Sequence, residues 1–194
     1  MTNLVLIRHG ETEWNVTGRY QGQANPPLNE NGRNQAHKLA DKLAAIGLDL
    51  LISSPLQRAA QTATIIASRI GVPCVFDDRL VEIHQGDWQT RLRSEIESLY
   101  PDLFQRWMTT PWEVTPPGGE NLEQVQMRVA ASVEDILCQY PQQIVGIVTH
   151  RVPIALIKLR FQDLDPDIVR TLDLPNAYFE SLIAHCVREK PIGE

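Results

Sequence analysis

Residues 4–10 read LVLIRHG, a run of four apolar residues that stops at an arginine, a histidine and a glycine. A continuous apolar run of this length is typical of a strand that is buried on both faces, as the strands of parallel sheets are. The glycine that follows it indicates a loop. The pattern therefore predicts a central strand that delivers Arg8 and His9 to a loop at its carboxyl end.

Strand and helix patterns alternate along most of the remaining chain. This alternation predicts an α/β fold with a mostly parallel central sheet and helices on both of its faces. The predicted elements are a helix over 29–46, a strand over 49–54, a helix over 59–70, a strand over 73–76, a helix over 90–108, a helix over 120–139, a strand over 144–150, a helix over 153–161 and a last strand within 179–187.

The middle of the chain interrupts the alternation. Between about residues 86 and 125 no strand is predicted, and residues 109–119 are rich in proline and glycine. We expect this segment to be a helical excursion that covers the carboxyl edge of the strands. At 194 residues the chain is long enough for one core, so we expect a single domain over 1–194 with this covering insertion at about 86–125.

Charge and composition exclude several classes of protein. The formal net charge of -6 disfavours a partner such as nucleic acid, which needs a basic surface. No apolar run is long enough for a membrane span, and the amino-terminal residues lack the features of a signal peptide. Three cysteines, Cys74, Cys138 and Cys186, lie in apolar stretches and are expected to be reduced core thiols. We expect a cytoplasmic protein; the sequence leaves open whether it forms a homodimer.

Three predicted strands end in residues that bind phosphate well. Arg8 and His9 follow the first strand, Arg58 lies just beyond the second, and His150 ends the strand over 144–150. In open α/β sheets ligands bind outside the carboxyl ends of the strands. We therefore expect these side chains to meet at one edge, with Glu82 at the start of the covering excursion.

Six blocks occur in a recognisable order: LVLIRHGETEWN, NPPLNENGRNQA, SSPLQRAAQTA, LVEIHQGDW, PPGGENL with Arg128 downstream, and IVTH. In this order and spacing the chain resembles the histidine phosphatase superfamily, which is similar to phosphoglycerate mutase. Within it the chain looks like the short bacterial branch of α-ribazole phosphatases, metal-independent phosphoserine phosphatases and proteins labelled phosphoglycerate mutase. The resemblance implies hydrolysis of a small phosphorylated metabolite through a phosphohistidine, with no cofactor and no metal ion.

The resemblance also implies residue roles. These roles are His9 as nucleophile, Glu82 as carboxyl acid, His150 as the second histidine at the transferring group, and Arg8, Asn15 and Arg58 as phosphate-binding residues. Beside these, we expect Gln21, Gly22 and Arg151 to be candidate substrate-binding residues.

Elementary chemistry supports these roles. A neutral imidazole is a competent nucleophile once a hydrogen bond to a carbonyl fixes its tautomer, and Gly10 or a neighbour could accept that bond. The guanidinium groups of Arg8 and Arg58 match phosphate oxygens and stay charged. Glu82 would protonate the leaving alkoxide if burial or a nearby phosphate raises its pKa.

Less specific interpretations remain beside these. Glu82 could simply pair with Arg79, and His84 near the expected site is more simply a surface histidine. Aromatic residues near the excursion could line a pocket or pack beneath it; they are Trp14, Tyr20, Trp88, Trp107 and Trp112.

The chain also departs from the family pattern. Arg151 stands where glycine is usual after the second histidine, and Gln89 replaces the glutamate of a common Trp-Glu-Gly run. We expect Arg151 to narrow the pocket or to bind a second anionic group of the substrate.

Two other functions compete with hydrolysis. The first is a cofactor-dependent phosphoglycerate mutase, which shares the phosphohistidine but returns phosphate to the substrate. The second is a non-catalytic protein that senses a phosphorylated ligand, which requires the loss of the nucleophile or the acid. Both His9 and Glu82 are present, so the sequence favours an enzyme.

Overall fold

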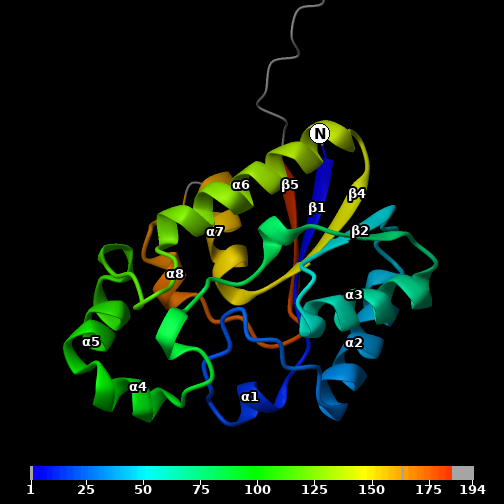
Figure 1. The fold of residues 1–194 in the computed structure, drawn as a ribbon. Helices are drawn as coiled ribbons and strands as arrows, with labels where there is room; N and C mark the ends of the chain where they lie inside the picture. The colour runs from blue at the N-terminus through cyan, green and yellow to red at the C-terminus, as the bar shows by residue number, and fades with distance from the viewer. Residues whose placement is uncertain (1, 163, 185–194) are drawn as a thin grey trace, which may run out of the picture.

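A five-stranded sheet runs through the described part of the chain (Figure 1). The computed structural model describes residues 2–162 and 164–184. The strand order is β3-β2-β4-β1-β5, and the first four strands run parallel while β5 runs antiparallel to β1. The predicted mostly parallel α/β sheet is therefore confirmed. The strands are β1 (Thr2–Arg8), β2 (Leu50–Ser53), β3 (Cys74–Phe76), β4 (Ile144–Thr149) and β5 (Phe179–Ala184).

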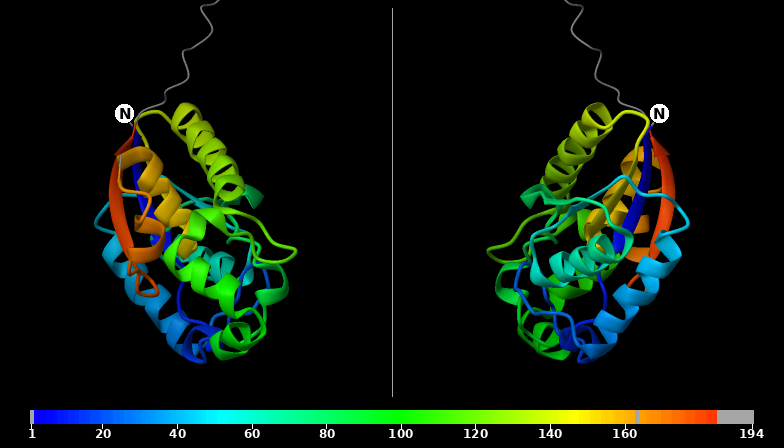
Figure 2. Two further views of the ribbon diagram at one scale, coloured as in Figure 1. Left: turned by 90° about the vertical axis from the view of Figure 1, so that its left-hand side faces the viewer. Right: turned by 90° about the vertical axis from the view of Figure 1, so that its right-hand side faces the viewer.

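Four long helices cover the two faces of the sheet (Figure 2). Leu4 and Leu6 of β1 pack into the core formed with α6 and α7, while Val5 and Ile7 pack into the core formed with α2 and α3. All four side chains are buried, which explains why the run is continuously apolar. These helices are α2 (Glu30–Leu43), α3 (Gln57–Ile70), α6 (Leu122–Gln139) and α7 (Arg151–Gln162).

Local sequence signals set most of the helix ends. Asn29 caps α2, because its side-chain oxygen accepts a 2.7 Å hydrogen bond from the backbone N–H of Gly32. Gly71 ends α3 in the left-handed conformation, with φ of 78°. The predicted start of α7 at Pro153 is two residues late: the helix begins at Arg151, so the proline occupies its first turn.

The covering segment contains two helices where the sequence predicted one over 90–108. They are α4 (Arg93–Leu99) and α5 (Pro101–Thr109), separated by Tyr100 with φ of -137°. A residue before proline is sterically disfavoured in the helical conformation, which accounts for the break. The segment packs on a small core of its own and lies beside the carboxyl ends of the central strands (Figure 1). That core consists of Trp88, Ile96, Phe104 and Val114.

Short elements that the sequence did not predict complete the description. They are α1 (Glu13–Val16), α8 (Ile168–Thr171) and the 3-10 turns η1 (Asp78–Leu80), η2 (Gly86–Trp88) and η3 (Pro111–Glu113). Among the described residues, no helix combines the length and the apolar character that crossing a membrane requires.

The cysteines differ from the expectation of three reduced core thiols. Cys74 is half-buried and free, and its pKa is raised by burial. Cys138 lies exposed on α6 and is disulfide-bonded, so the expectation is wrong for this residue. The sequence misled because an apolar neighbourhood on a helix does not tell which face a single residue takes. Cys186 lies outside the described residues.

Candidate active site

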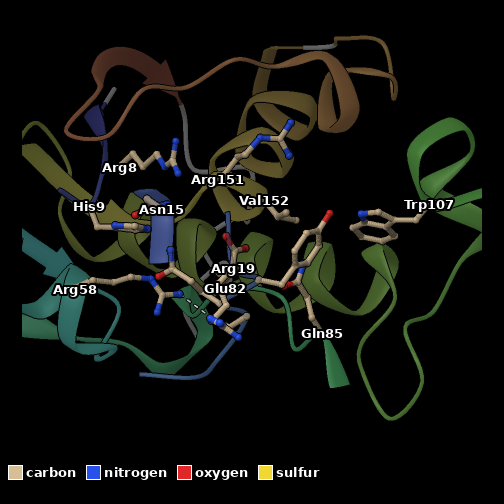
Figure 3. Close-up of a pocket in the computed structure, with 13 residues that line it drawn as sticks. Arg8, His9, Asn15, Arg19, Arg58, Glu82, Gln85, Trp107, Arg151 and Val152 are labelled. Carbon is tan, nitrogen blue, oxygen red and sulfur yellow. Dashed lines mark hydrogen bonds between the residues drawn. The ribbon is translucent and has the colours of Figure 1, made fainter. Parts of the chain in front are cut away.

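A cavity of about 240 Å³ opens at the carboxyl ends of the central strands (Figure 3). Strand pairing aligns Arg8 of β1 with Thr149 of β4, so the residues that follow both strands emerge at the same level. Eight of the nine predicted site residues line this cavity, and His150 is the exception. The lining residues are Arg8, His9, Asn15, Arg19, Tyr20, Gln21, Gly22, Arg58, Glu82, Gln85, Trp107, Arg151 and Val152.

His9 is held rigidly where β1 ends. Its ring Nδ1 lies 2.7 Å from the carbonyl oxygen of Gly10, a bond in which Nδ1–H donates and Nε2 keeps its lone pair. Burial, reinforced by the positive charges of Arg58 and Arg8, lowers the pKa of His9 well below its usual value. A buried, neutral imidazole with one fixed tautomer is therefore present at the cavity wall.

His150 lies beside His9 rather than on the cavity wall. The two ring centroids are 5.2 Å apart, and the ring is completely buried. Its Nε2 lies 2.8 Å from the hydroxyl oxygen of Ser54, whereas its Nδ1 has no partner among the described residues. Burial, with the charge of Arg58, lowers the pKa of His150 well below its usual value.

Arg58, in the first turn of α3, is almost fully buried at 1% exposure. Its guanidinium donates to the carbonyl oxygens of Gly22 at 2.7 Å and Ala24 at 2.9 Å, and its Nε has no partner among the described residues. Burial lowers the pKa of Arg58 to about 10, which still leaves the group charged at neutral pH. Gly22 thus shapes the site through its carbonyl group, which orients the guanidinium of Arg58.

Arg8 supplies a second guanidinium from the last residue of β1. It donates from Nη1 to the carbonyl oxygen of Leu174, and its buried Nε lacks a partner in the described part of the chain. Burial lowers the pKa of Arg8, and the nearby carboxylate of Glu82 opposes that shift. Arg8 and Arg58 therefore bring positive charge to the His9 end of the cavity from opposite sides (Figure 3).

Asn15 sits at the same end through a local turn. Its side-chain oxygen accepts bonds from the backbone N–H of Thr12 at 3.0 Å and from the amide of Asn176 at 3.3 Å. These two bonds use the side-chain oxygen, so the side-chain amide nitrogen of Asn15 is the group available to a ligand. Asn176 and Ala177 also donate to the carbonyl oxygen of His9, at 3.3 and 3.1 Å. These hydrogen bonds between residues 176–177 and residues 9–15 were not predicted, because no local sequence pattern indicates a contact between segments so far apart.

Glu82 lines the middle of the cavity, near Arg58 and between the His9 end and Trp107 (Figure 3). One of its carboxylate oxygens accepts a 3.0 Å hydrogen bond from the N–H of Ile83. Burial raises the pKa of Glu82, and this N–H together with Arg58 and Arg8 opposes the rise. The alternative that Glu82 pairs with Arg79 is wrong, because Arg79 pairs with Asp77 and Asp135 instead.

An ion pair behind the cavity fixes the backbone that carries Glu82. Arg128 of α6 donates to the carbonyl oxygens of Arg79, Val81 and Glu82, at 2.8, 2.7 and 3.0 Å. It also forms two bonds to the carboxylate of Glu120, at 2.9 and 3.0 Å. The sequence blocks that contain Glu120 and Arg128 thus support the segment of the expected acid.

The remaining wall residues extend the cavity away from His9. Arg19, Gln85 and Val152 were not predicted, since nothing in their local sequence reports their direction. Tyr20 and Trp107 line the cavity, whereas Trp88 is fully buried in the small core of the cover.

Gln89 substitutes for the usual glutamate of the family pattern. Its side-chain oxygen accepts bonds from the backbone N–H groups of Gln23 at 2.7 Å and Gln85 at 3.4 Å. An amide oxygen can accept these bonds as a carboxylate does. Gln89 therefore ties the Gln21–Gln23 turn to the covering segment. Gln21 lines the cavity and its buried Oε1 has no partner among the described residues.

Arg151 lies at the first residue of α7 and lines the cavity. Its Nη2 donates to the carbonyl oxygens of Arg170 and Leu172, both at 3.1 Å. No carboxylate pairs with it among the described residues. Its charge is therefore available to a ligand.

The doubly covered sheet and the buried histidine that lies between two arginines after its first strand define a phosphate-handling class of protein. The chain belongs to the histidine phosphatase superfamily (branch 1), whose family model matches residues 4–185. The resemblance seen in the six sequence blocks is thereby confirmed. Among residues 2–162 and 164–184, no group of three or more histidine, cysteine or acidic residues is arranged to hold a metal ion.

Similar proteins carry phosphatase and mutase names. The chain is 41% identical over 153 residues to phosphoserine phosphatase 1 of Hydrogenobacter thermophilus, covering 79% of this chain and 72% of that protein. It is 34% identical over 180 residues to a Yersinia enterocolitica protein named probable phosphoglycerate mutase, covering 91% and 82%. A solved mycobacterial glucosyl-3-phosphoglycerate phosphatase in complex with VO3 has a TM-score of 0.87 and 31% identity, covering 94% and 91%. The chain spans less than half of several longer mycobacterial relatives.

Proposed function

We propose that this chain, an enzyme of the phosphomonoesterase class, hydrolyses small phosphate monoesters through a phosphohistidine at His9 and without a metal ion. The observation that carries the proposal is the fixed tautomer of His9. Its Nδ1–H is committed to Gly10, so its Nε2 lone pair is free to attack between the guanidinium groups of Arg8 and Arg58.

The first step transfers the phosphoryl group to the enzyme. Arg8, Arg58 and the amide of Asn15 hold the phosphate oxygens, and His9 Nε2 attacks phosphorus in line with the leaving oxygen. The Nε2–P bond forms while the P–O bond to the leaving group breaks. Glu82 gives its proton to the leaving oxygen from its protonated form, which burial favours by raising the pKa of the carboxyl group.

The second step releases inorganic phosphate. Glu82, now a carboxylate, takes a proton from water, and the water oxygen attacks phosphorus as the Nε2–P bond breaks. His9 returns to the neutral state that its lowered pKa favours. We assign His150, whose ring lies beside that of His9, to the second contact with the transferring group, for which its unpartnered Nδ1 is the available atom.

Trapping the phosphoenzyme tests the proposal. Brief exposure to ³²P-labelled phosphomonoester should leave an acid-labile, base-stable label on the wild type and none on His9→Ala. Turnover should also survive exhaustive chelation. A label retained in His9→Ala, or activity lost to EDTA and restored by Mg²⁺, would show that the chemistry lies elsewhere.

A phosphoglycerate mutase is the second candidate, because several similar proteins are named probable phosphoglycerate mutase. The two activities share the phosphohistidine and differ in whether water or the product accepts the phosphoryl group. Incubation with monophosphoglycerate separates them: we expect free phosphate to appear faster than isomer exchange. Exchange without phosphate release would favour the mutase.

The expected binding partners and cellular location of the protein also remain predictions. We expect a small phosphorylated metabolite as the partner, no nucleic acid, and a cytoplasmic location. Disulfides are rare in the reducing cytosol, so the bonded state of Cys138 opposes this expected location. Measurement of the redox state of Cys138 in intact cells would test the location.

A further inference from the structure

A second cavity of about 210 Å³ adjoins the phosphate-binding cavity. The two share the four wall residues Tyr20, Trp107, Arg151 and Val152. Figure 3 shows that Trp107 lies at the opposite end of the site from His9, with Arg151 and Val152 between them. A ligand whose phosphate lies at His9 therefore reaches the second cavity by passing along this shared wall.

The second cavity combines an apolar lining with positive charge. Three of its residues are arginines, Arg93 from α4, Arg151 from α7 and Arg170 from α8. Glu82 is the one carboxyl residue among the described residues that line the two cavities, against six arginines. Such a concentration of one charge in a chain of net charge -6 points to an anionic ligand. The apolar part of the lining is Met108, Pro111, Val152 and Val169 with the rings of Tyr20 and Trp107.

The arginines of the second cavity are available to such a ligand. Arg93 pairs with Glu97 and Arg170 with Asp167, and in both pairs the side chains are more than a third exposed. Exposed pairs of this kind contribute little, so a ligand anion competes readily for either guanidinium. Arg151 has no carboxylate partner among the described residues and sits on the shared wall.

We propose that the second cavity binds the far end of the substrate, and that this end carries an anionic group joined to the phosphate through an apolar or planar body. The anionic group is a carboxylate or a second phosphate, since both fit the guanidinium fork. This inference rests on the proposed function, because it names the class of phosphomonoester that the same site hydrolyses. We expect a leaving group as short as serine to reach only the wall that the two cavities share, so that it makes no contact with Arg93 or Arg170.

A substrate series of graded length tests the proposal. The series consists of alkyl phosphates of increasing chain length that end in a carboxylate, in a second phosphate or in a neutral amide. In the wild type, the ratio of kcat/KM for each anionic compound to that of its amide should rise once the chain is long enough to pass Trp107. One charge-assisted hydrogen bond would give a preference of about 10-fold or more.

Variants locate the preference. Arg93→Gln and Arg170→Gln should each reduce the preference for long anionic substrates by about 10-fold, whereas the short members of the series should be far less affected. Arg69→Gln is the matched control, because Arg69 also forms an exposed pair, with Asp41, and lines neither of the two cavities. Unchanged circular dichroism would confirm that each variant is folded.

Two outcomes would overturn the inference while leaving the proposed function intact. One is a ratio near one at every chain length in an enzyme that does release phosphate. The other is a preference that Arg93→Gln, Arg170→Gln and Arg69→Gln all leave unchanged. If no member of the series and no p-nitrophenyl phosphate is hydrolysed, the proposed function itself has failed.

Discussion

Arg128→Lys should weaken the support of Glu82 and thereby slow the reaction of poor leaving groups. Arg128 donates five hydrogen bonds, two to Glu120 and three to the carbonyl oxygens of Arg79, Val81 and Glu82. Lysine keeps the charge but offers three donors on one nitrogen, so at least two of these bonds are lost. At roughly 0.5–1.5 kcal/mol each, the loss in the free energy of unfolding is about 1–3 kcal/mol.

The catalytic effect of Arg128→Lys should depend on the leaving group. A displacement of the acid by about 1 Å can cost on the order of 10² in rate, and an alkoxide needs a proton whereas p-nitrophenolate hardly does. Single-turnover labelling of His9 should therefore slow strongly with phosphoserine and slightly with p-nitrophenyl phosphate. Urea unfolding measures the stability change, and Arg69→Lys, at an exposed pair with Asp41, serves as the control.

Equal losses with the two substrates would refute this reasoning. They would mean that Arg128 supports the fold or the phosphate-binding end and has no particular effect on the acid. A change in stability without any change in labelling would lead to the same conclusion. The leaving-group comparison is decisive because a purely structural role predicts no difference between the substrates.

Further predictions follow from the buried ionisable groups and from the shared wall. Glu82→Gln should slow the labelling step by about 10² to 10⁴ with phosphoserine and little with p-nitrophenyl phosphate, and a similar loss with both would move the acid elsewhere. The same variant should be more stable than wild type at neutral pH, because a folded-state pKa raised above the ordinary value of 4.5 means that ionised Glu82 destabilises the fold. This difference in the free energy of unfolding should vanish in urea titrations below pH 4.5, where Glu82 is protonated in both states. His9 and His150 have lowered pKa values, so below about pH 6.5 the unfolded chain binds protons that the folded chain does not bind. The free energy of unfolding should therefore fall with pH, by up to about 1.4 kcal/mol per pH unit for each histidine. A flat urea midpoint between pH 5 and 6.5 would contradict this. Arg151→Gly should lower kcat/KM more for phosphoserine than for an uncharged alkyl phosphate, and an equal change in both would show that Arg151 does not select.

The sequence predicted the elements whose signals are local and periodic. The apolar run at 4–7 and the cap at Asn29 depend on neighbours within a few residues, and the structure has both. The single helix expected over 90–108 was wrong because Pro101 outweighs the helical pattern around it. A helix boundary of this kind depends on a single residue, and the helical spacing of apolar residues on either side does not indicate it.

The site shows the same division. Parallel strands bring their carboxyl ends to one edge, so the meeting of Arg8, His9 and Arg58 followed from their places after the ends of two predicted strands. The sequence could not predict Arg19 or Gln85, because their direction depends on how the covering segment packs against the sheet. Nor could it show that His150 lies fully buried beside His9 instead of on the cavity wall, since burial is a tertiary property.

The polar atoms left without partners explain how an acidic chain binds phosphate. Six buried side-chain N or O atoms lack a hydrogen-bond partner among the described residues, and four of them belong to predicted site residues, namely Arg8, Gln21, Arg58 and His150. Leaving a buried polar atom unpaired costs about 1–3 kcal/mol. A fold tolerates such a cost in one place when a ligand can supply the missing bonds there. Two of these atoms, the Nε atoms of Arg8 and Arg58, are N–H donors of residues that line the cavity, and in the proposed reaction they would stabilise a phosphoryl group without reorganisation. The net charge of the chain is therefore a poor guide to its ligand, because the local arrangement of buried guanidinium groups sets the field at His9.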